Sequence, residues 1–284
     1  MTVVTVSQAL VAAQTLGLDR LDAQLLLLHA LGKPAGDRAW LLAHDDDVLA
    51  VQVADQFFSF NQRRAAGEPL AYIVGYKEFF GLLFAVDARV LVPRPDTETL
   101  VQWTLDVLKD VADPQVLDLG TGSGAVAITV AHSLKPHPNS QVCATDFSED
   151  ALAVASCNAS RLGVAVQFIQ SNWFDKVSSH YHVIASNPPY IASADPHLAD
   201  LMHEPLTALT AGHDGLSDLR QIVQYAPKYL QPKGWLLLEH SYDQASAVCH
   251  LLTQRGFSQV QSRPDLAGIA RCSGGQWDNG ATDF

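Results

Sequence analysis

The chain has 284 residues, of which 48% are hydrophobic and 17% charged, so it can bury a full core, and it contains no apolar stretch long enough to span a membrane. Its net charge of −12, with no Lys/Arg cluster larger than the pair Arg63 and Arg64, disfavours a nucleic-acid partner, because a phosphate backbone requires a cationic face. No basic residue precedes Arg20, which argues against a secretory or transit signal, so we expect a cytoplasmic protein without membrane association.

Residues 1–72 are expected to form a small helical domain. Apolar residues recur there at three- and four-residue spacing, which predicts four helices, over Val6–Leu16, Arg20–Leu31, Arg38–His44 and Val48–Arg64. Such a domain can contribute stability or dimerisation, or it can dock a macromolecular partner. The sequence leaves both interpretations open.

Residues 73–92 are expected to form a β-hairpin that links the two parts of the chain. Apolar and aromatic residues cluster there around Gly75, Gly81 and Asp87, as is typical of paired strands and their turns. Pro93 and Pro95 then end the strand pattern. Asp96 or Thr97 can cap a helix that runs to about residue 110.

Residues 93–284 are expected to form an α/β domain in which strands and helices alternate. The pattern predicts seven strands, over Val116–Leu119, Gln141–Thr145, Val166–Ile169, His182–Ala185 and Trp235–Glu239 and near Val260 and Ile269. It also predicts helices over Ala125–Ser133, Glu149–Arg161, Leu216–Leu230 and Gln244–Gln254. Strands separated by such helices predict a doubly wound, mostly parallel sheet whose ligands lie beyond the carboxyl ends of the strands.

A glycine-rich loop directly follows the first strand of this domain. Gly120-Thr121-Gly122-Ser123-Gly124 lets the backbone approach a ligand and exposes the N–H groups of the next helix. With Ala125 the loop also fits the loose dinucleotide pattern G-x-G-x-x-A, so a nicotinamide or flavin cofactor stays open. Asp146, at the end of the second strand, can accept hydrogen bonds from both ribose hydroxyls of an adenosine. Its alternative role is to cap the helix that starts near Ser148.

A rigid turn follows the fourth strand of the domain. In Asn187-Pro188-Pro189-Tyr190, two consecutive prolines remove two backbone donors and fix φ, so the turn presents carbonyl oxygens and one Asn side chain. The Asn187 amide oxygen and the Pro188 carbonyl can each accept a hydrogen bond from a planar amino group, and the Tyr190 ring can pack against the face of that group. The turn therefore predicts a site for an –NH₂ group.

No metal site is predicted. The four cysteines are far apart in the sequence and form neither a C-x-x-C pair nor a disulfide framework, so we expect reduced thiols. Among the eleven histidines only His180 and His182 form a close pair, and no ligand spacing repeats nearby.

In its motifs and their order, the chain resembles the S-adenosylmethionine-dependent methyltransferases of the Asn/Asp-Pro-Pro-Tyr type. Within that group it is similar to the protein-(glutamine-N5) methyltransferases that modify peptide chain release factors. Besides the glycine loop and the Pro-Pro turn, the resemblance rests on Gly67-Glu68-Pro69-Leu70-Ala71-Tyr72, Glu78-Phe79, Leu91 to Glu98, Val116 to Leu119, Ile191, and Glu204 to Leu209. It covers nearly the whole chain and implies a seven-stranded methyltransferase sheet.

The resemblance implies a role for each candidate residue. The backbone of Gly120–Gly124 would pass under the methionine moiety of S-adenosyl-L-methionine, Asp146 would hold its ribose, and Trp173 would lie near its adenine. Asn187, Pro188, Pro189 and Tyr190 would grip the glutamine amide of a Gly-Gly-Gln tripeptide in the release factor, and Asn187 would also adjoin the cofactor. Asn187, Pro188 and Tyr190 would be the catalytic residues, and the helical domain would contact the rest of the release factor.

Some further positions refine this expectation. Arg94 and Glu98 would brace the wall of the active site. Asn172 stands where many relatives have Asp, so an adenine contact from that side chain does not follow from the resemblance. Ser273-Gly274-Gly275-Gln276 contains the tripeptide of the substrate itself, which we interpret as chance.

Four other functions compete with this expectation. A glutamine methyltransferase acting on a ribosomal protein shares the Pro-Pro turn, although Arg94-Pro95-Asp96-Thr97-Glu98 favours the enzyme that acts on release factors. An adenine-N6 nucleic-acid methyltransferase would grip an exocyclic amino group with the same turn after flipping the base, but the low basic charge disfavours it. A nicotinamide oxidoreductase would use the glycine loop and leave the turn without a role. A non-catalytic binding module would not need an intact turn.

Overall fold

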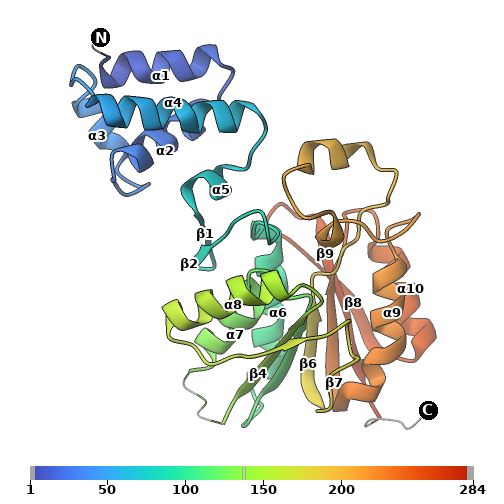
Figure 1. Ribbon diagram of the computed structural model, residues 1–284. Helices are drawn as coiled ribbons and strands as arrows, with labels where there is room; N and C mark the ends of the chain where they lie inside the picture. The colour runs from blue at the N-terminus through green and yellow to red at the C-terminus, as the bar shows by residue number, and fades with distance from the viewer. Residues whose placement is uncertain (1–3, 136, 138, 280–284) are drawn as a thin grey trace. The chain divides into compact units, whose positions relative to one another are not determined.

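The computed structural model describes residues 4–135, 137 and 139–279. By its internal contacts the chain divides into two compact units, Met1–Tyr76 and Lys77–Phe284. Figure 1 shows helices alone in the first unit and a helix-covered sheet in the second. All the candidate site residues belong to the second unit.

The first unit is a small bundle of helices around its own apolar core. Its helices are α1 (Val6–Thr15), α2 (Arg20–Ala30), α3 (Arg38–Ala43), α4 (Val51–Ala65) and α5 (Leu70–Val74). The four predicted helices are present, and α5 is an additional short one. Thr5 starts the bundle with a capping box, in which its Oγ1 accepts from Gln8 N at 3.3 Å and its own N donates to Gln8 Oε1 at 3.0 Å. Leu26, Leu27 and Leu28 of α2 are fully buried in the core.

The predicted hairpin is present but shorter than expected. It consists of β1 (Tyr76–Phe79) and β2 (Leu82–Ala85). Phe80 and Gly81 join the strands with φ of 51° and 77°, as a tight two-residue hairpin turn requires. The expectation that strand structure continues to Val92 is wrong, because residues 86–92 form no strand. Val90 and Val92 are nevertheless buried, so their apolar character reflects packing rather than strand pairing.

The second unit is built on a seven-stranded sheet, as predicted. Its strands are β3 (Gln115–Leu119), β4 (Gln141–Asp146), β5 (Gln167–Gln170), β6 (Tyr181–Ser186), β7 (Leu230–Glu239), β8 (Ser258–Pro264) and β9 (Ala270–Trp277). They lie in the order β5-β4-β3-β6-β7-β9-β8. The pairs from β5 to β7 are parallel, and β9 is antiparallel to both of its neighbours. The predicted doubly wound, mostly parallel fold is therefore confirmed.

Helices cover both faces of this sheet (Figure 1). One face carries α6 (Glu98–Leu108), α7 (Ala125–Ser133) and α8 (Glu149–Leu162), and the other carries α9 (Ser217–Tyr225) and α10 (Ala245–Arg255). Within the described ranges, short 3₁₀ segments complete the connections, namely η1 (Pro95–Thr97), η2 (Pro196–Leu201), η3 (Leu206–Ala208) and η4 (Ala226–Tyr229). Successive residues of a strand point to opposite faces of the sheet, and each face packs against its own helices. Leu117 and Leu119 point to the same face and pack with Leu219 and Ile222 of α9.

The strand order places the candidate residues together. The chain order reverses beside β3, which lies between β4 and β6, and Leu119 is in register with Thr145 of β4 and with Ser186 of β6. The residues that follow, Gly120, Asp146 and Asn187, therefore stand at one edge of the sheet. This is the topological switch point at which open α/β sheets bind their ligands.

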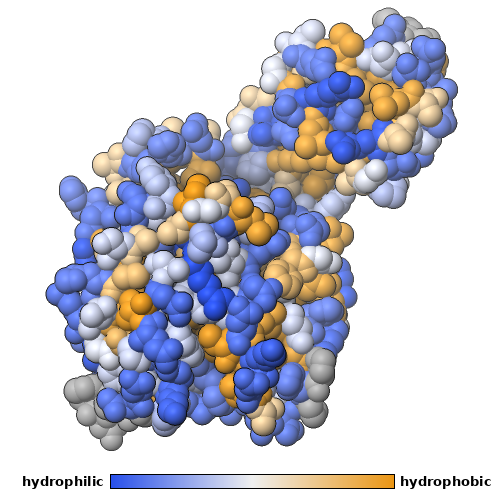
Figure 2. Space-filling model, turned by 180° about the vertical axis from the view of Figure 1, so that it is seen from behind, coloured by the Kyte–Doolittle hydropathy of each residue, from blue (hydrophilic) through white to orange (hydrophobic). Residues whose placement is uncertain are grey.

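No long apolar helix lies on the surface that the described residues form. Figure 2 shows apolar side chains mixed with polar ones over the face of each unit that it presents. None of the helices in the described part of the chain has the length and apolar character that crossing a bilayer requires.

Candidate active site

A cavity of about 270 Å³ lies at the carboxyl ends of β3, β4 and β6. Its lining comes from several segments of the second unit, namely Arg89 to Leu91, the glycine loop, Asp146 to Ala151, Ser171 to Trp173, the Pro-Pro turn, Pro205 to Ala208, and Asp218. A smaller cavity of about 50 Å³ shares Leu91, Gly120, Gly122 and Asn187 with it. The glycine loop and the Asn side chain thus border both spaces.

The glycines of the loop serve different purposes. Gly122 has a φ of +55°, and a Cβ atom built on it would meet nothing within 4 Å, because this residue borders the open cavity. Gly124 also has a positive φ, of +84°, but a Cβ there would lie 2.5 Å from Ile128 Cδ1 and 3.2 Å from the Ala155 Cβ of α8. Gly122 therefore leaves room for a ligand, whereas Gly124 allows α7 and α8 to approach each other.

Thr121 and Ser123 hold the loop in place. Thr121 Oγ1 donates to Asp118 Oδ2 at 2.6 Å, and Ala127 N donates to the same oxygen at 3.1 Å. Burial raises the pKa of Asp118 to about 7. The Ser123 carbonyl accepts from Asn158 Nδ2 at 2.9 Å. Both loop residues line the smaller cavity.

Asp146 presents its carboxylate to the larger cavity. Its Oδ2 accepts from Gly122 N and its Oδ1 accepts from Ser148 N, both at 2.9 Å. Burial raises the pKa of this carboxyl. The residue that caps α8 is Ser148, whose Oγ accepts from Ala151 N at 3.2 Å. Asp146 thus supports the loop before the helix and is not itself the cap.

Aromatic residues form the wall beside Asp146. Trp173 has a positive φ of 47°, and its ring lies 3.4 Å from the place that a Cβ on Gly120 would take. Its side chain forms a hydrogen bond with Asp218 of α9, a carboxyl whose pKa burial raises. Phe147 also lines the cavity and is 74% exposed, and Asn172 lines it as well. This wall can accommodate a flat ring.

The Pro-Pro turn places Asn187 at the junction of the two cavities. Asn187 Nδ2 donates to Thr97 Oγ1 at 3.2 Å, which leaves Oδ1 of the amide to accept a hydrogen bond. Pro189 lines the larger cavity, and Pro188 is buried. Tyr190 is not among the residues that border the two described cavities. Its OH donates to Glu239 Oε1 at 3.4 Å, and its carbonyl accepts from Gln244 Nε2 at 3.0 Å.

Glu239 and Thr97 were not identified as site residues from the sequence. Glu239 ends β7 and is 1% exposed, and burial raises its pKa to about 7. Thr97, one of the two expected capping residues, occupies the N-cap position of α6, but its side chain makes no capping hydrogen bond. Its hydroxyl instead interacts with Asn187 and with the Glu239 carboxylate.

Arg94 and Glu98 both stabilise segments near the cavities. Arg94 forms an ion pair with Glu204, whose other oxygen accepts from Val92 N at 3.1 Å. Glu98 Oε1 accepts from Phe80 N at 3.0 Å, at the turn of the hairpin. Arg94 also lines the smaller cavity.

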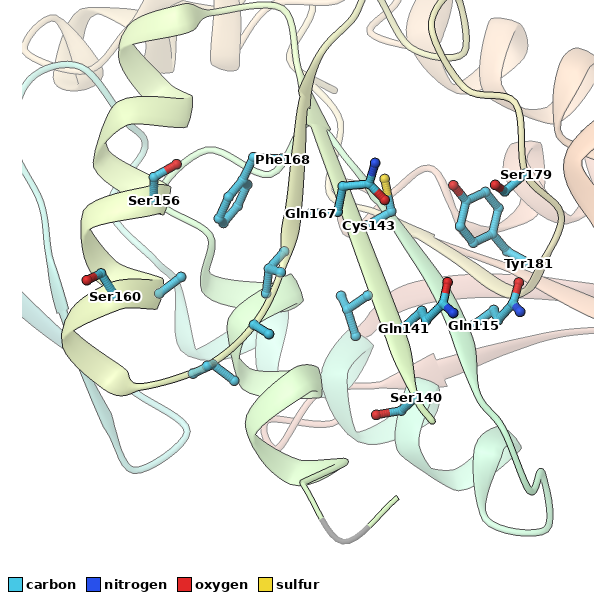
Figure 3. A pocket seen from close by; sticks show the side chains of 15 residues that line it. Gln115, Ser140, Gln141, Cys143, Ser156, Ser160, Gln167, Phe168, Ser179 and Tyr181 are labelled. Atoms are coloured by element: carbon cyan, nitrogen blue, oxygen red, sulfur yellow. The ribbon is translucent and has the colours of Figure 1, made fainter. Parts of the chain in front are cut away.

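A second and larger space lies at the opposite edge of the sheet. Figure 3 shows this groove of about 640 Å³, bordered by Gln115 and Gln141 at the starts of β3 and β4 and by Tyr181 at the start of β6. Its lining contains neutral side chains and no Asp, Glu, His, Lys or Arg in the described part of the chain. It therefore lacks the acid, base and ribose-binding groups that the carboxyl edge provides.

The tripeptide Gly274-Gly275-Gln276 is held inside the sheet. It belongs to β9, and Gln276 is paired in register with Trp235 of β7. Gln276 Nε2 donates to the Lys233 carbonyl at 2.9 Å. This glutamine amide is thus engaged within the sheet, away from the carboxyl end of β7.

Comparisons with known proteins identify the type of both units. Residues 4–75 match the family model described as PrmC N-terminal domain, and residues 96–212 match the one described as methyltransferase small domain. A release factor glutamine methyltransferase of Bordetella pertussis is 49% identical over 263 residues, which are 91% of this chain and 95% of the relative. A protein of the same name from Burkholderia pseudomallei is 46% identical over 269 residues, covering 91% and 92%.

A solved structure shares the fold. A methyltransferase from Pyrococcus furiosus aligns with a TM-score of 0.53 at 20% identity, over 77% of this chain and 99% of its own. The likeness covers the arrangement of helices and strands and supports the methyltransferase fold of the second unit.

Proposed function

Because the chain belongs to the release factor glutamine methyltransferase family, we propose that it transfers a methyl group from S-adenosyl-L-methionine to the side-chain nitrogen N5 of a glutamine. The proposed substrate is the Gly-Gly-Gln motif of class I peptide chain release factors, whose methylation modulates translation termination. The observation that carries this proposal is Asn187, whose Nδ2 is engaged by Thr97 and whose Oδ1 remains an acceptor beside both cavities.

The residues around the larger cavity fit S-adenosyl-L-methionine. Asp146 offers a carboxylate for the ribose hydroxyls, Trp173 and Phe147 offer aromatic surface for the adenine, and Gly122 leaves open space along the loop. The cofactor, when bound, supplies an electrophilic methyl group on a sulfonium. Asp146 and Gly122 would hold it, and Asn187 borders the same cavity.

The side-chain nitrogen of glutamine is a weak nucleophile, because the lone pair of an amide nitrogen is shared with the carbonyl. The enzyme must therefore hold this nitrogen in position for the reaction. Asn187 Oδ1 and the Pro188 carbonyl are two acceptors on one rigid turn, and each can take one hydrogen bond from the –NH₂ group of the glutamine. These hydrogen bonds strengthen as positive charge develops on nitrogen, so they stabilise the transition state more than the ground state. Fixed orientation can contribute about 7 to 11 kcal/mol in favourable cases.

The helical unit is proposed to dock the rest of the release factor. We assign residues 1–72 to this docking domain, 73–92 to the linker and 93–284 to the methyltransferase domain. Val11, Leu42 and Phe58 are apolar side chains exposed on the helical unit, and exposed apolar groups of this kind favour contact with another protein.

The proposed function is tested by transfer of a labelled methyl group from the cofactor to purified acceptors. The acceptors are a release factor, the same factor with Gln→Ala in the tripeptide, a ribosomal protein and DNA. The proposal predicts label on the wild-type release factor alone. Label on the Gln→Ala factor, or on the ribosomal protein or DNA in place of the release factor, would contradict it.

A further inference from the structure

Behind the Pro-Pro turn, a chain of polar side chains leads from Asn187, which borders the larger cavity, to Glu239, which does not. It runs from Asn187 Nδ2 to Thr97 Oγ1 at 3.2 Å, and the Thr97 hydroxyl adjoins the Glu239 carboxylate. Glu239 Oε1 accepts from Tyr190 OH at 3.4 Å, and the buried Glu239 Oε2 has no hydrogen-bond partner in the described part of the chain. We call Asn187, Thr97 and Glu239 the relay. Its members come from the end of β6, from η1 and from the end of β7, and β6 and β7 are adjacent parallel strands.

The charge state of Glu239 sets the direction of its hydrogen bonds. The residue is 1% exposed, and an ionised carboxylate can only accept hydrogen bonds. An ionised Glu239 can then accept the single hydroxyl proton of Thr97. The Thr97 oxygen is left to accept from Asn187, which must therefore direct Nδ2 inward and keep Oδ1 as its free acceptor.

We propose that Glu239 is a positioning residue for methyl transfer, which sets the orientation of the Asn187 amide through Thr97 so that Asn187 presents oxygen to the substrate –NH₂ group. This inference rests on the proposed function, because the amide orientation matters only if the substrate offers hydrogen-bond donors. Tyr190 is positioned by the same carboxylate, which gives the last residue of the turn a supporting role in place of the direct packing expected from the sequence.

Charged and titratable groups from several elements face Glu239. They are Asp96 of η1, Arg271 and Cys272 of β9, and Tyr190 of the turn. Arg271 also pairs with Asp96 at 3.2 Å and with Asp265 at 3.2 Å, so its charge is shared among carboxylates. At pH 8, above the pKa of about 7 that burial gives Glu239, the carboxylate is mostly ionised and the relay has the direction described.

The substitution Glu239→Gln tests this direction with almost no change in shape. A glutamine there can donate from its –NH₂ group to Thr97 Oγ1, and Thr97 can then donate to Asn187 Oδ1 and turn the amide around. Asn187 would present –NH₂ to the –NH₂ of the substrate, so a donor would face a donor. At pH 8 we expect the single-turnover rate of methyl transfer to fall roughly 100-fold, as when one preorganised transition-state contact is lost, with an unchanged affinity for the cofactor.

Two further variants separate positioning from stability. Thr97→Val keeps the side-chain shape but cuts the relay, and we expect a loss of roughly tenfold, as for one hydrogen bond. In the double variant the glutamine at position 239 no longer reaches Asn187 through a hydroxyl, so we expect Thr97→Val to restore part of the rate lost in Glu239→Gln. The matched control is Thr129→Val, because the Thr129 hydroxyl is buried in α7 without a hydrogen-bond partner among the described residues, and its rate should equal that of the wild type.

Binding provides a readout that does not depend on turnover. With the demethylated cofactor present, the affinities for release factors carrying Gly-Gly-Gln and Gly-Gly-Glu are compared, because a turned Asn187 favours a carboxylate. The proposal predicts that Glu239→Gln shifts this preference towards the Glu factor. It is overturned if the preference does not move, or if the rate losses of Glu239→Gln and Thr97→Val multiply in the double variant. If the wild type does not methylate the release factor, the proposed function fails as well.

Discussion

Gly122 donates its backbone N–H to Asp146 Oδ2 at 2.9 Å, which joins the glycine loop after β3 to the end of β4. The carboxylate therefore orders the loop and faces the cavity at the same time. Asp146 Oδ1 accepts from Ser148 N, so a backbone N–H fixes each oxygen of the carboxylate. Each oxygen keeps a second lone pair that can accept a hydrogen bond from a ligand.

Replacement of Asp146 is expected to weaken the cofactor more than it slows the chemistry. Asp146→Ala removes the proposed ribose contacts and the hydrogen bond to the loop. Since hydrogen bonds to charged groups contribute about 1.5 to 3 kcal/mol, the dissociation constant for S-adenosyl-L-methionine should rise by roughly 10- to 100-fold. Titration calorimetry measures it. Asp150→Ala, an exposed acidic residue in the first turn of α8, is the control and should bind normally. Normal cofactor affinity in Asp146→Ala would refute the ribose assignment.

Replacement of Asn187 is expected to have the opposite effect. Asn187→Ala removes one of the two acceptors for the glutamine amide, and the loss of a single preorganised hydrogen bond of this kind slows a reaction by roughly 100- to 1,000-fold. The single-turnover rate at saturating cofactor is the measurement, with cofactor affinity close to that of the wild type. An unchanged single-turnover rate would mean that the turn does not hold the reacting amide.

The glycine loop allows stability and binding to be separated. In Gly124→Ala the added methyl group meets Ile128 Cδ1 at 2.5 Å, so we expect a loss of about 1 to 3 kcal/mol in the free energy of unfolding. In Gly122→Ala the methyl group meets no atom of the protein, so the free energy of unfolding should fall by only about 1 kcal/mol, because of the positive φ. The methyl group does extend into the cavity, so we expect weaker binding of the cofactor. Urea unfolding and cofactor titration should therefore rank the two variants in opposite orders. If the same variant were the more impaired in both measurements, Gly122 would not be specific to cofactor binding and Gly124 would not be specific to stability.

The stability of the fold is expected to depend on the Asp118 proton. The pKa of this buried carboxyl is raised from 3.8 to about 7, so between these values the folded state holds a proton that the unfolded state has released. The free energy of unfolding should thus fall as pH rises from about 4 to about 7, and Glu239, with a pKa also raised to about 7, contributes in the same direction. Asp118→Asn should flatten part of this dependence in urea titrations across the range. An unchanged slope would show that Asp118 does not carry the proton.

Much of the fold was predictable because the relevant signals are local. The strands of the sheet and helices such as α7 follow from the spacing of apolar residues, and the turn after β6 follows from two adjacent prolines. The predicted strand at residues 90–92 was wrong for a physical reason. Val90 and Val92 are buried without being paired in a strand, and apolar spacing cannot distinguish those two situations.

The part of the site that sequence reasoning missed depends on contacts between distant positions. The hydrogen bond between Asn187 and Thr97 joins residues 90 positions apart, and the contact between Tyr190 and Glu239 joins residues 49 positions apart. Thr97 has the local pattern of a helix cap, and Glu239 has that of a strand end. Thr97 and Glu239 come together behind the turn only because β6 and β7 are adjacent strands and α6 packs on both of them.

The placement of the glutamine amide by Asn187 can be seen in a crystal structure of the enzyme with the demethylated cofactor and a Gly-Gly-Gln peptide. We expect the glutamine nitrogen to lie within hydrogen-bond distance of Asn187 Oδ1 and the Pro188 carbonyl, in line with the sulfur atom. An Asn187 side chain turned away from the sulfur, with no space there for the glutamine, would show that the turn does not hold the reacting amide.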